Sequence, residues 1–504
     1  MPKHLENIVY RLNGRPTKAA PKKTEVTSKN THRKLKSNNK KTVPNNLGLN
    51  LEGSVPFVPT WEPYNREAEY LVNIVLELIG YVPAGVKTDA KYRRVVASVL
   101  ALSSVVITKV DGVLAISKND KHWAQYSVGK VVILDVIRLL ESKGFISFVP
   151  DTGQRHFDPD ENDKKKWIGI LSQYNIDDAL QELKGYWDSK WVETGRPAVL
   201  IGKPETRGTA INRKKMGIKK PKIPITVVKN TFGRQYSKAV KGVNLLVTYW
   251  KDHPLELPLT DNSFTPYAAC ATRIYHNGKL DSGGRYYGAW TNVSSKQRLK
   301  GLIDDEPLVE IDLNASQPTL FSSLMGYTME VENTWSDLYA GIVRNLGDEE
   351  ESIKRKKIKQ AAVEVIGTGN IAKKHPAKDS GVTWAERGEY EFYIASLLSH
   401  VPALTHLNTD YYNGAGFISY HEAEIMTETL HTLMSKNVVA YPVHDCLLVK
   451  RDDQELALET YRATIRNYVL KFNKATGVEA VDITVPVSIE ESAKPKVRIS
   501  GSYN

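Results

Sequence analysis

The alternation of apolar and polar positions predicts a mixed α+β chain. Between residues 62 and 165, some stretches carry apolar residues at helical spacing, and others are short β-rich runs. The helical stretches are 67–80, 91–107 and 128–143, and the β-rich runs are 112–117, 145–149 and 154–157. Residues 235–504 also alternate strands and helices, with a late helix over 454–472 and a final strand over 483–489. A chain of 504 residues with this pattern predicts about two to four domains.

The segment 62–165 resembles a winged helix-turn-helix, a domain that plasmid-type replication initiators use. Its helices are followed by a β-hairpin whose returning strand contains Arg155. The resemblance implies DNA contacts through the helix at 128–143 and through the hairpin. The same pattern also suits a small α+β domain with a structural or protein-binding role, so both interpretations stay open.

Most of the positive charge lies at the start of the chain. The formal net charge is +12, and residues 1–42 hold twelve Lys or Arg against two acids, a net of +10. This composition predicts a disordered basic arm over 1–60, which either attracts the phosphates of nucleic acid or is a plain solvated tail. A second basic stretch, 203–234, predicts a mobile linker within a connector over 166–234.

Cysteine content and hydropathy indicate the compartment. With only two cysteines, Cys270 and Cys446, the chain has neither a disulfide framework nor a multi-cysteine zinc site. The longest apolar stretch, 95–107, contains serines and is too short to span a bilayer. The N-terminal residues lack the apolar core of a signal peptide. We therefore expect a cytoplasmic protein without a membrane partner, in the host cytoplasm if a phage encodes it.

Two aspartates stand at the ends of apolar strand-like runs. Asp312 follows the run that begins at Leu308, and Asp445 lies between the β-rich runs that flank His444. Either aspartate alone is explained by a hydrogen-bonded structural role, because a buried charge needs a partner. Together they suggest a pair of divalent ions for phosphoryl transfer, since Mg²⁺ prefers carboxylate oxygen.

The order of these motifs resembles that of the family A DNA polymerases and the phage-type single-subunit RNA polymerases, over residues 270–492. The segment from Asp312 to Gln317 is similar to motif A of that superfamily, and the segment 443–445 is similar to motif C. Between them, Arg355 and Lys359 reproduce the Arg-x-x-x-Lys step of motif B. Upstream, the Gly-Gly-Arg-Tyr-Tyr-Gly segment at 283–288 resembles the element that contacts the template–primer duplex.

The resemblance implies a polymerase right hand over 235–504, with an antiparallel palm sheet and helical fingers and thumb. It places two Mg²⁺ ions, with Mn²⁺ as an alternative, on Asp312 and Asp445. It also implies nucleotide contacts and template–primer contacts. The nucleotide-binding residues would be Arg355, Lys359 and Gln317, and the template–primer residues would be Arg285, Arg298 and His444.

Three departures from the family pattern leave the sugar preference open. Cys446 stands where the DNA polymerases carry Glu and the RNA polymerases a small Ser. Gln317 stands where the DNA polymerases carry the Glu that screens out ribonucleotides. The segment 363–369 lacks the tyrosine that ends motif B. In addition, the N-terminal half shows no acidic constellation for a 3′–5′ exonuclease, so we expect no proofreading.

The sequence therefore predicts a template-directed nucleotidyltransferase that acts on a DNA template–primer with nucleoside triphosphates. DNA synthesis for a phage, plasmid or other mobile element is the first hypothesis, and an RNA polymerase or primase-like enzyme is the alternative. A non-catalytic, DNA-binding replication initiator is a hypothesis of another class. A metal-dependent nuclease is a third, because paired carboxylates with Mg²⁺ also cut phosphodiesters.

Removing residues 1–42 should reduce the salt dependence of DNA binding, because each cation that contacts a phosphate adds to the salt slope. The measurement is the DNA dissociation constant at several salt concentrations, for the full chain and the shortened chain. Chemistry on a pre-primed template should survive the deletion. An unchanged salt slope would show that the arm does not touch phosphates.

Overall fold

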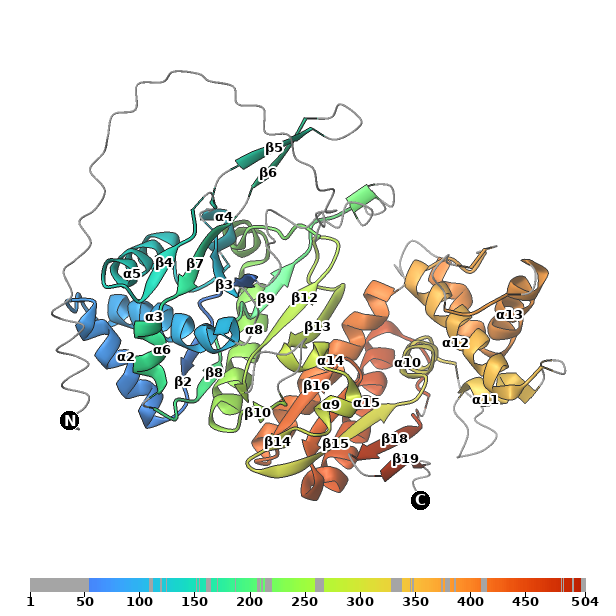
Figure 1. Cartoon of the computed structure of the whole chain (residues 1–504). Helices are drawn as coiled ribbons and strands as arrows, with labels where there is room; N and C mark the ends of the chain where they lie inside the picture. Colours follow the sequence, from blue (N-terminus) through green and yellow to red (C-terminus); the bar gives the residue numbers. More distant parts are fainter. Residues whose placement is uncertain are drawn as a thin grey trace. The chain divides into compact units, whose positions relative to one another are not determined.

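The computed structural model describes residues 54–499 with some gaps. The omitted residues within this range are 108–111, 118–119, 124, 151, 154, 160–164, 170, 186, 206–208, 210–211, 214–219, 259–266, 328–337, 345, 347–348, 373–374, 377–380, 385–386, 409–414, 482, 484 and 492–493. The basic arm expected over 1–60 thus lies almost wholly outside the described residues. The chain divides into two compact units, which are described separately (Figure 1). Unit 1 comprises residues up to 196 together with 205–220, and unit 2 comprises 197–204 and 221–504.

Unit 1 is a mixed α+β unit built around a four-stranded sheet in the order β1-β3-β7-β4. Its helices are amphipathic, and Asn65 caps the N-terminus of α2, because its side chain accepts a hydrogen bond from the backbone N–H of Ala68. The elements are β1 (Ser54–Pro56), β2 (Trp61–Pro63), α2 (Arg66–Leu78), α3 (Val86–Ile107), β3 (Val113–Ile116), α4 (Asp120–Trp123), α5 (Lys130–Ser142), β4 (Ile146–Phe148), β5 (Arg155–Pro159), β6 (Lys165–Gly169), β7 (Ser172–Ile176), α6 (Asp178–Gly185) and β8 (Trp191–Glu193).

The hairpin expected between 145–149 and 154–157 does not form as predicted. Strand β4 pairs with β7 instead, with Phe148 opposite Tyr174, while β5 pairs with β6. The reason is burial, because Tyr174 and Ile176 of β7 supply apolar side chains to the core. The expected domain boundary at 165 also differs from the structure, since β7 belongs to this sheet and the unit continues to residue 196.

Unit 2 contains two sets of paired strands. One is a three-stranded sheet in the order β13-β12-β9, formed by β9 (Val199–Ile201), β12 (Ala271–Tyr275) and β13 (Gly283–Gly288). In the other, β15 is central and pairs antiparallel with β17, β18 and β14. Its strands are β10 (Leu255–Glu256), β11 (Tyr267–Ala268), β14 (Leu302–Ile303), β15 (Glu306–Leu313), β16 (Ala440–Val443), β17 (Cys446–Lys450), β18 (Val487–Glu491) and β19 (Lys494–Ile499). The final strand expected over 483–489 therefore begins at Val487.

The helices of unit 2 pack on these strands and on one another. A helical subdomain, α11 to α13, shares one apolar core with Phe321 of α10 and Ile418 of α14. The helices are α8 (Ile225–Asp252), η1 (Ala289–Asn292), α9 (Ser295–Arg298), α10 (Ser316–Leu324), α11 (Leu338–Arg344), α12 (Glu351–Thr368), α13 (Arg387–His400), η2 (Pro402–Asn408), α14 (Ala415–Ser435), η3 (Arg451–Asp453) and α15 (Gln454–Thr476). The last ten residues of the connector expected over 166–234 form the first turns of α8. In the described part of the chain, no helix is both long and apolar enough for a membrane span.

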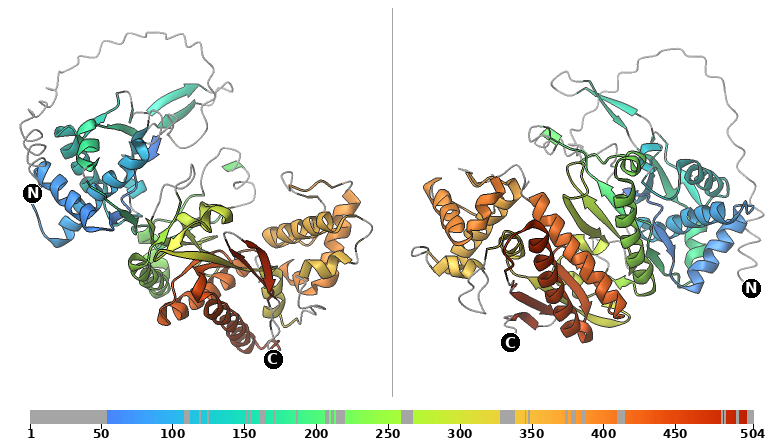
Figure 2. Two further views of the ribbon diagram at one scale, coloured as in Figure 1. Left: turned by 60° about the horizontal axis from the view of Figure 1, so that its bottom comes forward. Right: turned by 180° about the vertical axis from the view of Figure 1, so that it is seen from behind.

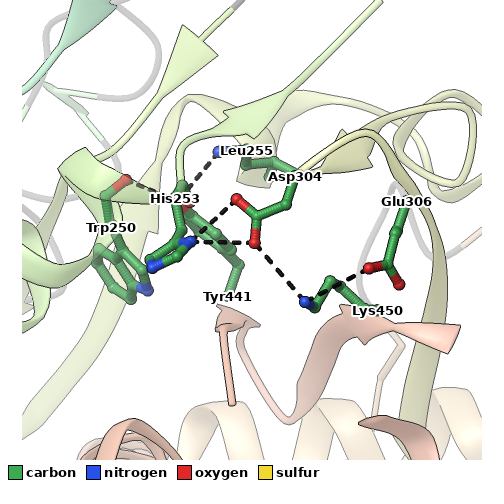
Figure 3. A network of polar contacts seen from close by, with 7 residues as sticks. All are labelled: Trp250, His253, Leu255, Asp304, Glu306, Tyr441 and Lys450. Atoms are coloured by element: carbon green, nitrogen blue, oxygen red, sulfur yellow. Dashed lines mark hydrogen bonds and ion pairs between the residues drawn. The ribbon is translucent and has the colours of Figure 1, made fainter. Parts of the chain in front are cut away.

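A polar network joins the C-terminal end of α8 to the edge of the central strands (Figure 3). The ring Nδ1 of His253 lies 2.9 Å and 3.0 Å from the two carboxylate oxygens of Asp304. Lys450 Nζ lies 3.6 Å from the same carboxylate. The hydroxyl of Tyr441 donates to the carbonyl of His253 at 2.7 Å and accepts from the N–H of Leu255 at 3.0 Å. These contacts fix where α8 ends relative to β14, β16 and β17.

Helices α14 and α15 lie side by side, and both pack on the central strands (Figure 2). His421 of α14 is buried between them, with its Nδ1 2.8 Å from the hydroxyl of Tyr468. Its ring contacts the rings of Phe417 and Phe472. Burial lowers the pKa of His421 from its ordinary value of 6.5 to about 4, because the charged ring would lose its hydration.

Acid should therefore destabilise the protein through His421. Because its pKa is lower in the folded chain, the unfolded chain binds the proton first, and this part of the stability is lost as the pH falls from 6.5 towards 4. Between neutral pH and about pH 5, the free energy of unfolding should fall by about 2 kcal/mol less in His421→Gln than in the wild type. The measurement is urea unfolding at both pH values. The exposed His400→Gln is the control and should follow the wild type, whereas an identical acid loss in His421→Gln would contradict this account.

Candidate active site

Asp312 is carried by the central strand of unit 2. Val309 and Ile311 on one face of the strand and Leu308 on the other are fully buried, so the strand has apolar contacts on both faces. β15 is paired on both edges over this stretch, with Asp312 opposite Cys446 of β17 and Ser488 of β18. Pairing on both edges fixes the register of Asp312 within the sheet.

Asp445 lies in the two-residue turn that joins β16 to β17. Val443 and Cys446 are paired, so His444 and Asp445 form the loop of a tight hairpin. His444 has a φ of 59°, a left-handed conformation that costs a non-glycine residue about 1–2 kcal/mol. Ala315, just after β15, has a φ of 50°. Both aspartates thus stand beside strained turns, a feature that is common at functional sites.

Neighbouring hydroxyls hold Asp445 in place. Ser316, the first residue of α10, donates its hydroxyl to Asp445 Oδ2 at 2.5 Å. The hydroxyl of Tyr461 on α15 donates to the backbone carbonyl of Asp445 at 3.0 Å. The turn at Ala315 therefore places the start of α10 against the hairpin that carries Asp445.

The structure brings the two predicted metal-binding aspartates together. One side-chain ligand atom from each of Asp312, Asp445 and Cys446 lies within 4.8 Å of the other two. The Cys446 thiol donates a hydrogen bond to Asp312 Oδ1 over 2.8 Å. Two carboxylates at this separation fit a site for divalent cations, which take carboxylate oxygens from more than one segment.

The electrostatics of Asp445 also fit a cation. Burial raises the pKa of Asp445 to about 6, and the nearby carboxylates of Glu422 and Asp312 add to the rise. The hydroxyl of Ser316 and the guanidinium of Arg285 act in the opposite direction without cancelling it. A divalent cation between the carboxylates would supply the positive charge that this cluster lacks.

Glu422 is a site residue that the sequence reasoning did not identify. It lies on α14 with an exposed fraction of only 3%, and it forms an ion pair with Arg285. Gln317 Nε2 approaches the same carboxylate oxygen at 3.4 Å. Its other oxygen, Oε1, is buried and has no hydrogen-bond partner among the described residues. The available signal was a charged residue on the apolar face of α14, one turn after Ile418 and one turn before Met426.

Arg298, predicted to contact the template–primer, lies in the interior of unit 2. Its guanidinium forms an ion pair with Glu310 of β15, with an Nη2–Oε2 distance of 3.0 Å, and both side chains are more than nine-tenths buried. It also donates to the carbonyl of Val293. In this position Arg298 holds the strand that carries Asp312, two residues along from Glu310.

His444 precedes Asp445 in the hairpin turn and is close enough to Arg285, another predicted template–primer residue, to feel its charge. Its ring packs edge-on against Tyr287 at 5.5 Å. Burial lowers the pKa of His444, and the positive charge of Arg285 lowers it further. The ring is therefore neutral near neutral pH, and its Nδ1 is buried without a hydrogen-bond partner among the described residues.

The two predicted nucleotide-binding cations lie on α12. The guanidinium of Arg355 lies 5.9 Å from the ring centroid of Tyr339, and Lys359 is exposed. Lys357, on another face of the helix, is buried and forms ion pairs with Glu349 and Glu389. These contacts give Lys357 a structural role within the helical subdomain. Binding of a triphosphate by Arg355 and Lys359 stays a prediction.

Comparison with known proteins adds little to this geometry. No protein-family model matches the chain, and no curated protein matches it. Among solved structures, the chain is similar to the POL domain of Pol1 from M. smegmatis, in complex with DNA primer-template and dNTP. The identity is 9%, the match covers 59% of this chain and 57% of that one, and the TM-score is 0.31. A likeness at that TM-score decides neither the fold nor the function.

Removing the guanidinium of Arg298 should destabilise the protein. Arg298→Ala should lower the free energy of unfolding by about 3–5 kcal/mol, because Glu310 would remain buried as an unpaired charge. The double variant Arg298→Met/Glu310→Leu should recover part of that loss. Lys296→Ala, at an exposed position of the same short helix, should change it by no more than about 0.5 kcal/mol.

Urea unfolding measures these differences, and DNA affinity measured on the same preparations tests the alternative. A loss of DNA affinity in Arg298→Ala with unchanged stability would contradict the structural role and favour the template contact that the resemblance implies.

Proposed function

We propose that the chain is a template-directed nucleotidyltransferase that extends a nucleic-acid primer, and that the product is DNA. The observation that carries the proposal is that side-chain ligand atoms of Asp312 and Asp445, from segments far apart in sequence, lie within 4.8 Å of each other in a partly buried cluster. The order of the polymerase-like motifs along the sequence supports it. Unit 1, with its winged-helix-like sequence, and the basic arm would deliver the enzyme to DNA.

Asp312 and Asp445 would hold two Mg²⁺ ions, or Mn²⁺ as an alternative. When bound, such ions activate the attacking 3′-hydroxyl and stabilise the leaving pyrophosphate. Ser316 keeps the Asp445 carboxylate in one orientation through its hydrogen bond. Arg298 keeps β15, and with it Asp312, in place through Glu310. Positioning of this kind is the main contribution that a protein makes to phosphoryl transfer.

Arg355 and Lys359 would bind the triphosphate. At positions i and i+4 they share one face of α12. Fixed cations stabilise the negative charge that develops on the leaving phosphates. The helical subdomain packs on α10, which also carries Gln317, so the triphosphate-binding helix and the metal-binding strands belong to one packed body.

Arg285, His444 and Gln317 would contact the primer and the incoming nucleotide. Gln317 and Arg285 both reach the Glu422 carboxylate, which therefore orients them beside Asp445. In this arrangement Glu422 is a positioning residue. The side chain at Gln317 would influence which sugar the enzyme accepts.

A metal-dependent nuclease is the second candidate. It is favoured by the three acids Asp312, Asp445 and Glu422, since a carboxylate cluster with divalent ions suffices for phosphodiester hydrolysis. Arg355 and Lys359 would have no clear role in that reaction. Synthesis and degradation of one labelled primer therefore separate the two candidates.

Replacing either aspartate should abolish primer extension while DNA binding stays intact. Asp312→Asn and Asp445→Asn each remove one negative charge and one metal ligand with little change in shape. The measurement is extension of a labelled primer on a DNA template with Mg²⁺, in parallel with deoxynucleotides and ribonucleotides, and with a lane that lacks primer. The expected loss is at least about a hundredfold, the scale for loss of one electrostatic group at a catalytic centre.

Asp281→Asn, at an exposed position of the turn before β13, is the matched control and should extend the primer normally. Normal synthesis by Asp312→Asn or Asp445→Asn would refute the site assignment. Shortening of the primer by the wild type, without extension in any lane, would favour the nuclease. Tight DNA binding with neither reaction would favour the non-catalytic initiator.

A further inference from the structure

The thiol of Cys446 is part of the carboxylate cluster. Cys446 follows Asp445 directly and is paired across the sheet with Asp312. Its Sγ donates to Asp312 Oδ1 over 2.8 Å, and its ligand atom lies within 4.8 Å of those of both aspartates. The donor set at this place is therefore one sulfur and two carboxylates.

A sulfur ligand changes which cations the cluster prefers. Mg²⁺ binds oxygen ligands and has little affinity for thiolates. Zn²⁺ and other thiophilic ions bind cysteine sulfur together with carboxylate oxygen, and three protein ligands with an open fourth position are a common zinc arrangement. A site for Mg²⁺ alone would gain from this cysteine only its hydrogen bond to Asp312 and no ligand atom.

A second observation points to a ligand at the same place. Glu422 is 3% exposed, and its carboxylate oxygen Oε2 lies 3.4 Å from Nε2 of Gln317, the residue after the Ser316 that hydrogen-bonds Asp445. The Oε1 of Glu422 has no hydrogen-bond partner among the described residues. A buried, unsatisfied carboxylate oxygen beside two further acids is costly unless a cation compensates it.

We propose that Asp312, Asp445 and Cys446 form a mixed sulfur–oxygen site that binds a thiophilic divalent cation, such as Zn²⁺, in competition with Mg²⁺. Binding breaks the hydrogen bond from Cys446 to Asp312. The thiol gives up its proton to the solvent, and its sulfur forms a bond to the ion. Because the same carboxylates would hold Mg²⁺, the protein with Zn²⁺ bound would be inactive in synthesis. This inhibition rests on the proposed function, whereas the binding of Zn²⁺ does not.

Cadmium is the probe, because a cadmium–thiolate bond gives an ultraviolet charge-transfer absorption that an oxygen-only site lacks. The full chain is titrated with Cd²⁺ in the absence of Mg²⁺, and absorption is recorded with each addition. The wild type should show the absorption, and Cys446→Ser should lose it and bind Cd²⁺ at least about tenfold more weakly. Cys270→Ser removes the chain's only other cysteine, which is also buried, and should behave as the wild type.

A second variant tests the carboxylate ligands. Asp445→Asn retains the thiol but should weaken Cd²⁺ binding by a similar factor, because the site loses an anionic ligand. Circular dichroism on each variant checks folding, and Cys446→Ala replaces Cys446→Ser if the serine does not fold. Persistence of the absorption in Cys446→Ser, its loss in Cys270→Ser, or unchanged affinity in Asp445→Asn would each overturn the proposal.

Primer extension in Mg²⁺ by the same preparations keeps the two proposals separate. In the wild type, added Zn²⁺ should inhibit extension, and excess Mg²⁺ should relieve the inhibition. Cadmium absorption without any extension would support the mixed site and contradict the polymerase. Extension without cadmium absorption would support the polymerase and contradict the mixed site.

Discussion

The closeness of like charges at the end of β15 is the constraint on which the rest of unit 2 depends. Asp312 and Asp445 repel each other, and burial beside Glu422 raises the pKa of Asp445 to about 6. The pairing of β15 with β17 holds Asp312 opposite Cys446, the residue that follows Asp445, and so keeps the two carboxylates close despite the repulsion. A buried cluster of carboxylates lowers the stability of the fold, and this cost is explained if the carboxylates bind cations.

The elements around the cluster act together to hold it. β15 pairs with a strand on each edge, and the buried ion pair between Arg298 and Glu310 connects it to the short helix α9. Ser316 at the start of α10 hydrogen-bonds Asp445. Each contact comes from a different element, so the geometry of the two aspartates reports on the packing of the whole unit.

The sequence predicted the elements that carry strong local patterns. The apolar run before Asp312 and the two β-rich runs around Asp445 indicate strands, and the structure confirms those strands and the closeness of the two aspartates. Local patterns do not determine which strands pair. The expected hairpin after residue 145 was wrong for that reason, because β7, which lies more than twenty residues later, offers a more apolar partner.

Side-chain partners were harder still to predict. The place of Arg298 in the motif order predicts a template contact, yet in the structure Arg298 forms a buried ion pair with Glu310. No local sequence pattern links these two residues, because they meet only when β15 packs beside α9. Glu422 was missed because its role depends on which face of α14 meets β13. Its charge on an otherwise apolar helix face was the only local sign.

The most direct test of the account is to locate Mn²⁺ in crystals of the full chain by anomalous diffraction. Mn²⁺ substitutes for Mg²⁺ at carboxylate sites and scatters anomalously. If the two aspartates bind metal, anomalous peaks lie between the carboxylates of Asp312 and Asp445 and disappear in crystals of Asp445→Asn. Fully ordered carboxylates with no peak between them, at a Mn²⁺ concentration that gives peaks elsewhere, would contradict the assignment of this cluster as a metal-binding active site.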